Sequence, residues 1–161
     1  MSEVIRLLES RDRPSLEALL SDISVFSTEE TSVALELIDF ALNNPGQTDY
    51  LIYVLAQQDE VIGYHCTGKR PLTDGVYDLY WIVVNQQKAG KGSGSRLLRH
   101  AERLVNEAKG RWLLCETSSR AIYDKTRSFY AKNGYEVVAS IPDFYSTGDA
   151  LMIYGKSFKN N

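Results

Sequence analysis

The clearest chemical signal in the chain lies in residues 87–96, whose sequence is QKAGKGSGSR. Alternating glycines at positions 90, 92 and 94 let the backbone approach a ligand closely. A helical pattern follows, and the unpaired N–H groups at a helix start favour an anion such as phosphate or pyrophosphate. The segment therefore predicts an anion-binding turn. Three side chains add positive charge to it, namely Lys88, Lys91 and Arg96.

Two common nucleotide-binding motifs do not fit this segment. A Walker loop requires GxxxxGK followed by Ser or Thr, and no glycine here stands in that frame. A Rossmann turn requires GxGxxG, whereas these glycines alternate as GxGxG. The pattern that fits is QxxGxG, formed by Gln87, Gly90 and Gly92 after the apolar run from Asp78 to Val84.

This strand and turn resemble motif A of the GCN5-related N-acetyltransferase (GNAT) family. The segment Phe129–Tyr135 is similar to a later helix of that family, in which Tyr is followed, after three residues, by Gly and an aromatic residue. The resemblance covers about Val61 to Tyr154. It implies that the strand end and turn bind the pantetheine arm and pyrophosphate of acetyl-CoA (coenzyme A). The implied cofactor residues are Ile82, Val83, Val84, Gln87, Lys88, Ala89, Gly90, Lys91, Gly92, Ser93, Gly94 and Ser95.

Acetyl transfer from a thioester to an amine needs an N–H donor for the developing oxyanion and a proton for the departing thiolate. The resemblance implies that backbone N–H groups of Ile82–Val84 are the donor and that Tyr130 is the acid. A phenol keeps its proton at neutral pH; a packing role for Tyr130 is the alternative. Seven residues earlier, where the family often has Asn, this chain has Tyr123. Its hydroxyl, or that of Ser118 or Ser119, is a candidate replacement for the cofactor contact.

The same reaction needs a base that takes the ammonium proton, directly or through a water. Asp78, early on the cofactor strand, is the first candidate, and Glu116, at the end of the next strand, is the second. A carboxylate that only hydrogen-bonds a turn is the alternative interpretation of Asp78.

The acceptor side is predicted from aromatic residues. Phe26 and Tyr50 are candidates to line the acceptor pocket. Asp143 and Asp149 are candidates to supply negative charge for an ammonium group. A solvated turn is the alternative for residues 141–145. The expected substrate-binding residues are Tyr80, Trp81, Glu116, Phe144 and Tyr145.

The apolar periodicity predicts one α/β domain over residues 1–161, with a mixed sheet of about six or seven strands flanked by about four helices. The expected order is β-α-α-β-β-β-α-β-α-β-β. The strand–helix–strand units over 76–115 and 112–139 predict parallel neighbouring strands. One helix is expected over 121–132. The last strands are expected over 135–139 and 150–154, joined by a loop.

Composition excludes several classes of protein. With 161 residues, 43% hydrophobic and 24% charged, the chain is neither disordered nor collagen-like. A net charge of −3 without a basic run makes nucleic acid a poor partner. The two cysteines and two histidines are not spaced as metal ligands, so we expect no metal. The chain shows no signal peptide and no apolar run long enough for a membrane helix, which predicts a cytoplasmic protein. Exposed strand edges allow a homodimer.

The resemblance to the GNAT family implies an enzyme, an N-acetyltransferase that moves the acetyl group of acetyl-CoA directly to a primary amine of a small molecule in a ternary complex. Transfer to a protein N-terminus or lysine is the first alternative. A non-catalytic acyl-CoA-binding regulatory domain is the second. The sequence leaves open the acceptor, the acyl group of the donor and the choice of base.

Overall fold

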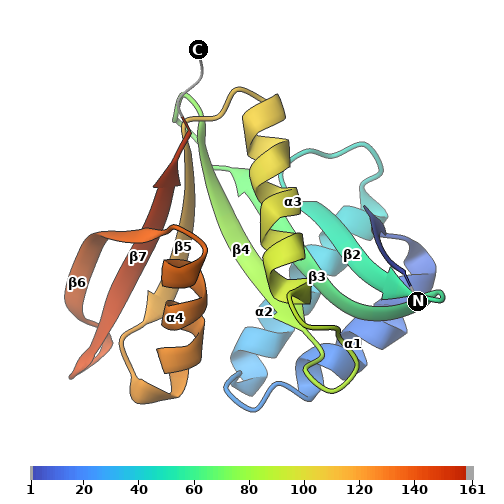
Figure 1. The fold of residues 1–161 in the computed structure, drawn as a ribbon, viewed down its shortest axis with the longest axis horizontal. Coiled ribbons are helices and arrows are strands. Elements are labelled where there is room, and N and C mark those ends of the chain that lie inside the picture. The colour runs from blue at the N-terminus through green and yellow to red at the C-terminus, as the bar shows by residue number, and fades with distance from the viewer. Residues whose placement is uncertain (1, 159–161) are drawn as a thin grey trace. The chain divides into compact units, whose positions relative to one another are not determined.

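A computed structural model describes residues 2–158, which form a mixed α/β fold (Figure 1). Its seven-stranded sheet has the order β1-β2-β3-β4-β5-β7-β6, and four α-helices accompany it. The predicted fold class is confirmed. The strands are β1 (Glu3–Leu7), β2 (Leu51–Gln57), β3 (Glu60–Lys69), β4 (Val76–Val84), β5 (Trp112–Ser118), β6 (Glu136–Ser146) and β7 (Asp149–Ser157). The helices are α1 (Arg13–Ser21), α2 (Thr28–Asn43), α3 (Ser93–Glu107) and α4 (Asp124–Lys132), with 3₁₀ turns η1 (Ser10–Asp12) and η2 (Ala121–Tyr123).

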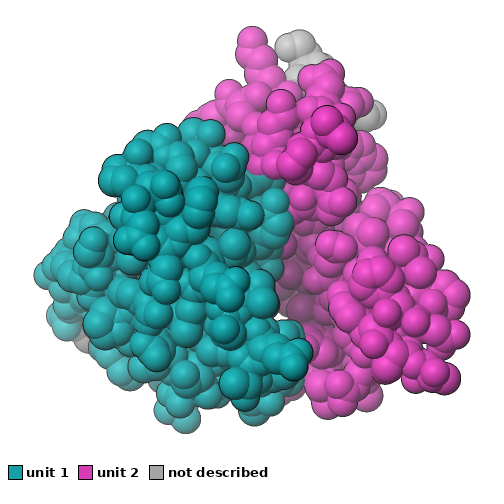
Figure 2. All heavy atoms as spheres, turned by 180° about the vertical axis from the view of Figure 1, so that it is seen from behind, with its two compact units in different colours: residues 1–68, 80–101 teal, residues 69–79, 102–161 magenta. Residues whose placement is uncertain are grey.

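The fold divides into two compact units, coloured separately in Figure 2. Unit 1 comprises residues 2–68 and 80–101, and unit 2 comprises residues 69–79 and 102–158. Strand β4 passes from unit 2 into unit 1 after Leu79, and α3 passes back after Ala101. The single domain over residues 1–161 stays a prediction.

In unit 1, helices α1 and α2 cover one face of the strands and the first turns of α3 lie on the other (Figure 1). The alternation of side chains in β2 explains this arrangement. Ile52 and Val54 join the core with α1 and α2, whereas Leu55 packs with Leu97 of α3. Such strands are buried on both faces, which is why the sequence over β2 and β3 is almost continuously apolar.

In unit 2, β4 pairs with β5 in parallel, as predicted, from Val76↔Trp112 to Leu79↔Cys115. The expectation that β5 and the strand after α4 are neighbours was wrong. Strand β7 lies between β5 and β6 and runs antiparallel to both. The reason is the tight turn at Thr147–Gly148, which folds β7 back directly beside β6.

Two further boundaries differ from the sequence prediction. The loop expected after residue 139 is mostly strand, because β6 continues to Ser146 and β7 begins at Asp149. Pro142 misled the prediction, since proline is tolerated in edge strands. The helix expected over 121–132 begins with the separate 3₁₀ turn η2, and α4 starts only at Asp124.

Strand β6 is the last strand of the sheet, and all of its residues are exposed. Its register with β7 shifts between Val137 and Ala139 and again between Ile141 and Ser146. Such irregularities, together with proline, hinder an outside strand from pairing with an edge. The homodimer expected from exposed edges therefore stays a prediction.

In unit 1, the buried His65 of β3 meets the half-buried His100 of α3. His65 Nδ1 lies 2.9 Å from Thr67 Oγ1, and its Nε2 lies 2.9 Å from His100 Nδ1. The Tyr53 ring stacks on His65 at 5.7 Å between centroids and lies 4.5 Å from His100. Burial, with His100 beside it, lowers the pKa of His65 to about 3. His65 is thus neutral in the folded protein near neutral pH.

We expect the free energy of unfolding to fall as the pH is lowered below about 6.5, the ordinary pKa of histidine. In this range the unfolded chain binds a proton at His65 that the folded chain does not bind. Thermal unfolding measured between about pH 7.5 and about pH 5 checks this. Because the chain has two histidines, His100→Gln is the matched control. His100→Gln should keep the pH dependence and His65→Gln should lose it; the reverse pattern would contradict the assignment.

Candidate active site

The glycine-rich turn of unit 1 is organised by Asn85, the first residue after β4. Its N–H donates to the Ile62 carbonyl at 2.8 Å, which continues the strand by one bond. Its side-chain oxygen accepts the N–H of Gln87 at 3.0 Å, and its own carbonyl accepts the N–H of Ala89 at 2.9 Å. Asn85 was not among the residues predicted for the site, although Asn directly after a strand is a signal for such a turn.

Gly92 carries the backbone feature that the turn requires. Its φ is +87°, in the region that residues other than glycine rarely adopt. Gly90 has no such φ value. Helix α3 begins at Ser93, so residues 93–95 belong to the first helical turn and not to the loop that the sequence predicted. The first N–H groups of a helix attract anions, and the place of residues 93–95 beside a ligand stays a prediction.

The positive charge expected at this turn is mostly neutralised in unit 1. Lys88 forms an ion pair with Glu60, and Arg96 forms one with Glu3. The Glu3 carboxylate also accepts the Ser93 hydroxyl at 2.6 Å and the Gly90 N–H at 3.2 Å. These contacts hold the pKa of Glu3 below its ordinary value, and the hydrogen bond from Ser93 has the largest effect. The turn therefore offers backbone N–H groups more than free cations.

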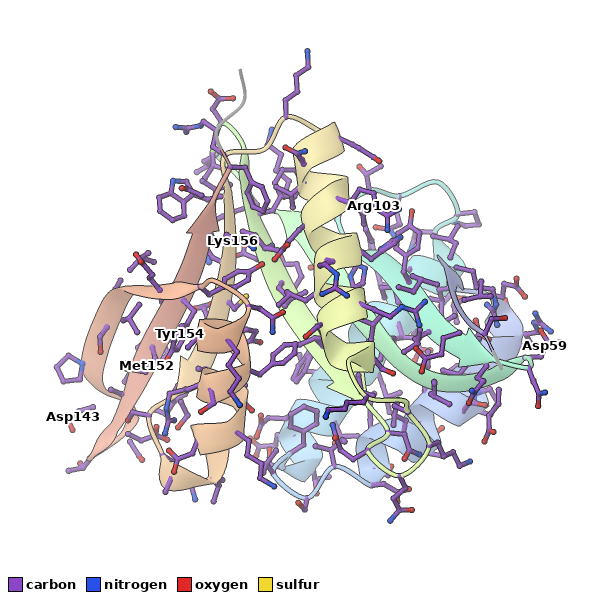
Figure 3. All side chains as sticks on the ribbon, viewed as in Figure 1. Asp59, Arg103, Asp143, Met152, Tyr154 and Lys156 are labelled. Atoms are coloured by element: carbon purple, nitrogen blue, oxygen red, sulfur yellow. The ribbon has the colours of Figure 1, made fainter. Side chains whose placement is uncertain are left out.

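Tyr130 of α4 is buried in unit 2. Its ring packs against the rings of Phe129, Tyr135 and Tyr154, the last at 5.7 Å between centroids. Tyr154 is labelled on β7 in Figure 3. The Tyr130 hydroxyl interacts with the Cys115 thiol. Burial is the larger cause and the thiol the smaller one of a pKa of Tyr130 well above its ordinary value. The phenol therefore stays protonated.

The two carboxylates considered as the base lie close to one arginine in unit 2. Asp78 is 7% exposed and accepts three hydrogen bonds from Arg70, at 2.7, 3.1 and 3.2 Å. The carboxylate of Glu116 lies 3.8 Å from the same guanidinium, and its side chain is 44% exposed. Asp78 binds the guanidinium through both of its oxygens, whereas Glu116 only approaches it and is more open to solvent. The geometry favours Glu116 over Asp78.

Strand β5 separates the acid from this base. Cys115, which contacts Tyr130, and Glu116 are consecutive residues of the strand. Consecutive side chains of a strand point to opposite faces. Tyr130 and Glu116 thus lie on opposite faces of β5.

The residues around Tyr123 are already hydrogen-bonded within unit 2. Tyr123 is the N-cap residue of α4. The Ser118 hydroxyl donates to the buried Asp149 carboxylate, and the Ser119 hydroxyl accepts the Ala150 N–H at 2.8 Å. These bonds tie β5 to β7, so the two serines and Asp149 have structural partners. Tyr123 remains the candidate for the cofactor contact.

The aromatic residues predicted at the acceptor site fall into two groups. In unit 1, Trp81 meets Phe26 edge to face at 5.3 Å, and Tyr80 meets Tyr50 at 5.4 Å. In unit 2, Phe144 and Tyr145 of β6 meet at 5.0 Å, and each is half exposed. Asp143, beside them, accepts the Gly148 N–H at 2.7 Å and closes the hairpin.

Both cysteines are free and buried, and burial raises the pKa of each thiol, which suits packing and not nucleophilic attack. Among residues 2–158, no group of three His, Cys, Asp or Glu is placed to hold a metal ion. None of the helices in this range is long and apolar enough to span a membrane.

An open hollow of about 480 Å³ in unit 1, lined by Val4, Arg6 and Asp59 among others, contains none of the predicted site residues.

Comparison with known proteins identifies the family. A family model described as an acetyltransferase (GNAT) domain matches residues 48–137, more than half of the chain. The chain therefore belongs to the GNAT acetyltransferase family. A solved structure from Desulfovibrio desulfuricans, assigned to the same family, is 32% identical over 97% of this chain and 99% of that chain, with a TM-score of 0.92.

Two more distant structures share the fold. The ribosomal-protein-S18-alanine N-acetyltransferase of Escherichia coli is 19% identical, with a TM-score of 0.74 over 99% of this chain and 96% of that chain. An aminoglycoside 6′-N-acetyltransferase complexed with coenzyme A is 17% identical, with a TM-score of 0.74 over 98% of both chains. No protein of curated function matches the chain.

Proposed function

We propose that the protein transfers the acetyl group of acetyl-CoA to a primary amine of a small molecule, directly, in a ternary complex. The observation that carries the proposal is the turn after β4 in a GNAT chain. A positive-φ glycine, an Asn-organised loop and the start of α3 together present backbone N–H groups to an anion. Acetyl-CoA would supply an activated acetyl thioester, with its pyrophosphate on this turn.

The oxyanion is assigned to main-chain N–H groups of Ile82–Val84. Support comes from the ladder between β4 and β5, which ends at Leu79↔Cys115. A strand that leaves its neighbour no longer spends its N–H groups on that ladder. Such groups stabilise the charge that develops on a carbonyl oxygen under attack.

The proton steps are assigned to the two faces of β5. The amine nitrogen forms a bond to the acetyl carbon, and the bond from that carbon to sulfur breaks. Glu116 takes the proton that the nitrogen loses. Tyr130 gives its proton to the departing sulfur. Since the nitrogen and the sulfur are bonded to the same carbon, Glu116 on the other face of β5 would take the proton of the nitrogen through a water.

A small-molecule acceptor is favoured by the aromatic surface of unit 1. Rings of Phe40, Tyr50 and Tyr80 meet edge to face at 5.5 and 5.4 Å, and Phe40 and Tyr80 are partly exposed. Flat aromatic walls enclose a compact organic amine or attract its cationic form. We also propose a cytoplasmic location, where the two free cysteines would stay reduced.

The direct test is release of free coenzyme A thiol from acetyl-CoA in the presence of a panel of amines. We expect turnover with at least one small amine. Labelled acetyl-CoA incubated with cell lysate is the second arm. A labelled protein band without small-amine turnover would favour the protein acetyltransferase. Binding of coenzyme A without any turnover would favour the regulatory domain.

Tyr130→Phe should lower kcat by about 100-fold or more, since the variant keeps the ring but loses the proton donor. Tyr154→Phe is the matched control, because this ring packs directly against Tyr130. Its kcat should stay at the wild-type value. Steady-state kinetics of both variants, with thermal unfolding to confirm folding, decide the point. Unchanged kcat in Tyr130→Phe would remove it as the acid.

The two carboxylates should separate activity from stability. Glu116→Gln should lower kcat by about 100-fold with little change in thermal unfolding. Asp78→Asn should lower the unfolding temperature, because it leaves the Arg70 guanidinium without its buried partner. The kcat of folded Asp78→Asn should stay within a few-fold of wild type. The opposite pattern in kcat would restore Asp78 as the base.

A further inference from the structure

Glu3, at the start of β1, contacts the glycine-rich turn at several points, and no sequence motif predicts these contacts. One carboxylate oxygen accepts the Gly90 N–H at 3.2 Å and the Ser93 hydroxyl at 2.6 Å. The other accepts from the Arg96 guanidinium, which also donates to the Glu3 carbonyl at 3.0 Å. All of these groups lie in unit 1. A single residue thus holds the turn at three points.

These contacts differ from an ordinary surface ion pair. The Glu3 side chain is 9% exposed, and Ser93 is 2% exposed. A Cβ placed on Gly90 would lie 3.3 Å from the Glu3 carboxylate, so the carboxylate packs directly against the backbone of the turn. Charge-assisted hydrogen bonds made away from water are stronger than those at the surface.

The partners of Glu3 lie on both sides of Gly92, the residue with positive φ. Gly90 precedes it, and Ser93 begins α3 directly after it. The Ser93 N–H donates to the Gly90 carbonyl at 3.2 Å, and the Ser93 hydroxyl lies 2.7 Å from the same oxygen. Glu3 therefore closes a network that sets the distance and angle between the loop and the first turn of the helix.

We propose that Glu3 is a positioning residue that holds the glycine-rich turn in the geometry that binds the pyrophosphate of acetyl-CoA. The inference rests on the proposed function, in which this turn binds the cofactor. Holding the loop in place before binding removes the ordering cost that a mobile loop pays when a ligand arrives. A carboxylate that instead competed with the ligand for the same donors would have the opposite effect. Acetyl-CoA would then bind more tightly when Glu3 is removed.

The test compares Glu3→Gln with Glu60→Gln. Both replace one glutamate that pairs with a cation of the turn, but Glu60 pairs with the Lys88 side chain at an exposed site. We expect Glu3→Gln to weaken coenzyme A binding by about tenfold in calorimetry, the effect of losing one charge-assisted hydrogen bond. Glu60→Gln should leave binding unchanged or slightly tighter. Equal or tighter binding by Glu3→Gln would overturn the proposal.

A second readout separates positioning from general damage to the fold. Glu3→Gln should raise the KM for acetyl-CoA at unchanged kcat. The KM for S-acetylpantetheine, which lacks the pyrophosphate, should not change. Equal increases for both donors would show a structural role only and overturn the proposal. If Glu3→Gln does not fold, Glu3→Asp keeps the charge but withdraws the carboxylate, and the same comparison applies. Wild-type protein that does not bind coenzyme A would instead refute the proposed function.

Discussion

The parallel ladder between β4 and β5 runs for four residue pairs and ends at Leu79↔Cys115. The other features of the proposed site depend on this short ladder. Before it ends, Asp78 lies on β4 in unit 2, with its carboxylate bound to Arg70. After it ends, β4 continues in unit 1 toward Asn85 and the glycine-rich turn. A strand hydrogen-bonded to β5 along its full length would have no main-chain N–H groups left for a thioester.

Strand β5 provides the second constraint through the simple alternation of its side chains. Cys115 faces Tyr130, and Glu116 therefore faces the other way, toward Arg70. This arrangement explains why two neighbouring residues have such different surroundings. The face with Tyr130 is apolar and keeps a phenol protonated, and the face with Glu116 is open to solvent.

The electrostatics of the turn follow from carboxylates that are distant in sequence. Lys88 pairs with Glu60, 28 residues away, and Arg96 pairs with Glu3, 93 residues away. Pairing of this kind limits the free positive charge, so the proposed recognition of an anion depends on oriented N–H groups. Backbone donors of this type need a fixed loop, which makes the groups that hold the loop as important as those that contact the ligand.

Sequence reasoning predicted the fold class, the anion-binding turn and the helix that carries Tyr130, because each is encoded by neighbouring residues. Apolar periodicity reports which face of a strand or helix is buried, and glycine spacing reports where the backbone needs freedom. Only the tertiary structure decided the strand order β5-β7-β6, the pairing of Asp78 with Arg70, and the contact of Glu3 with the turn. These depend on which residues meet across long stretches of chain, and a charge or hydrogen-bond donor in a sequence does not indicate its partner.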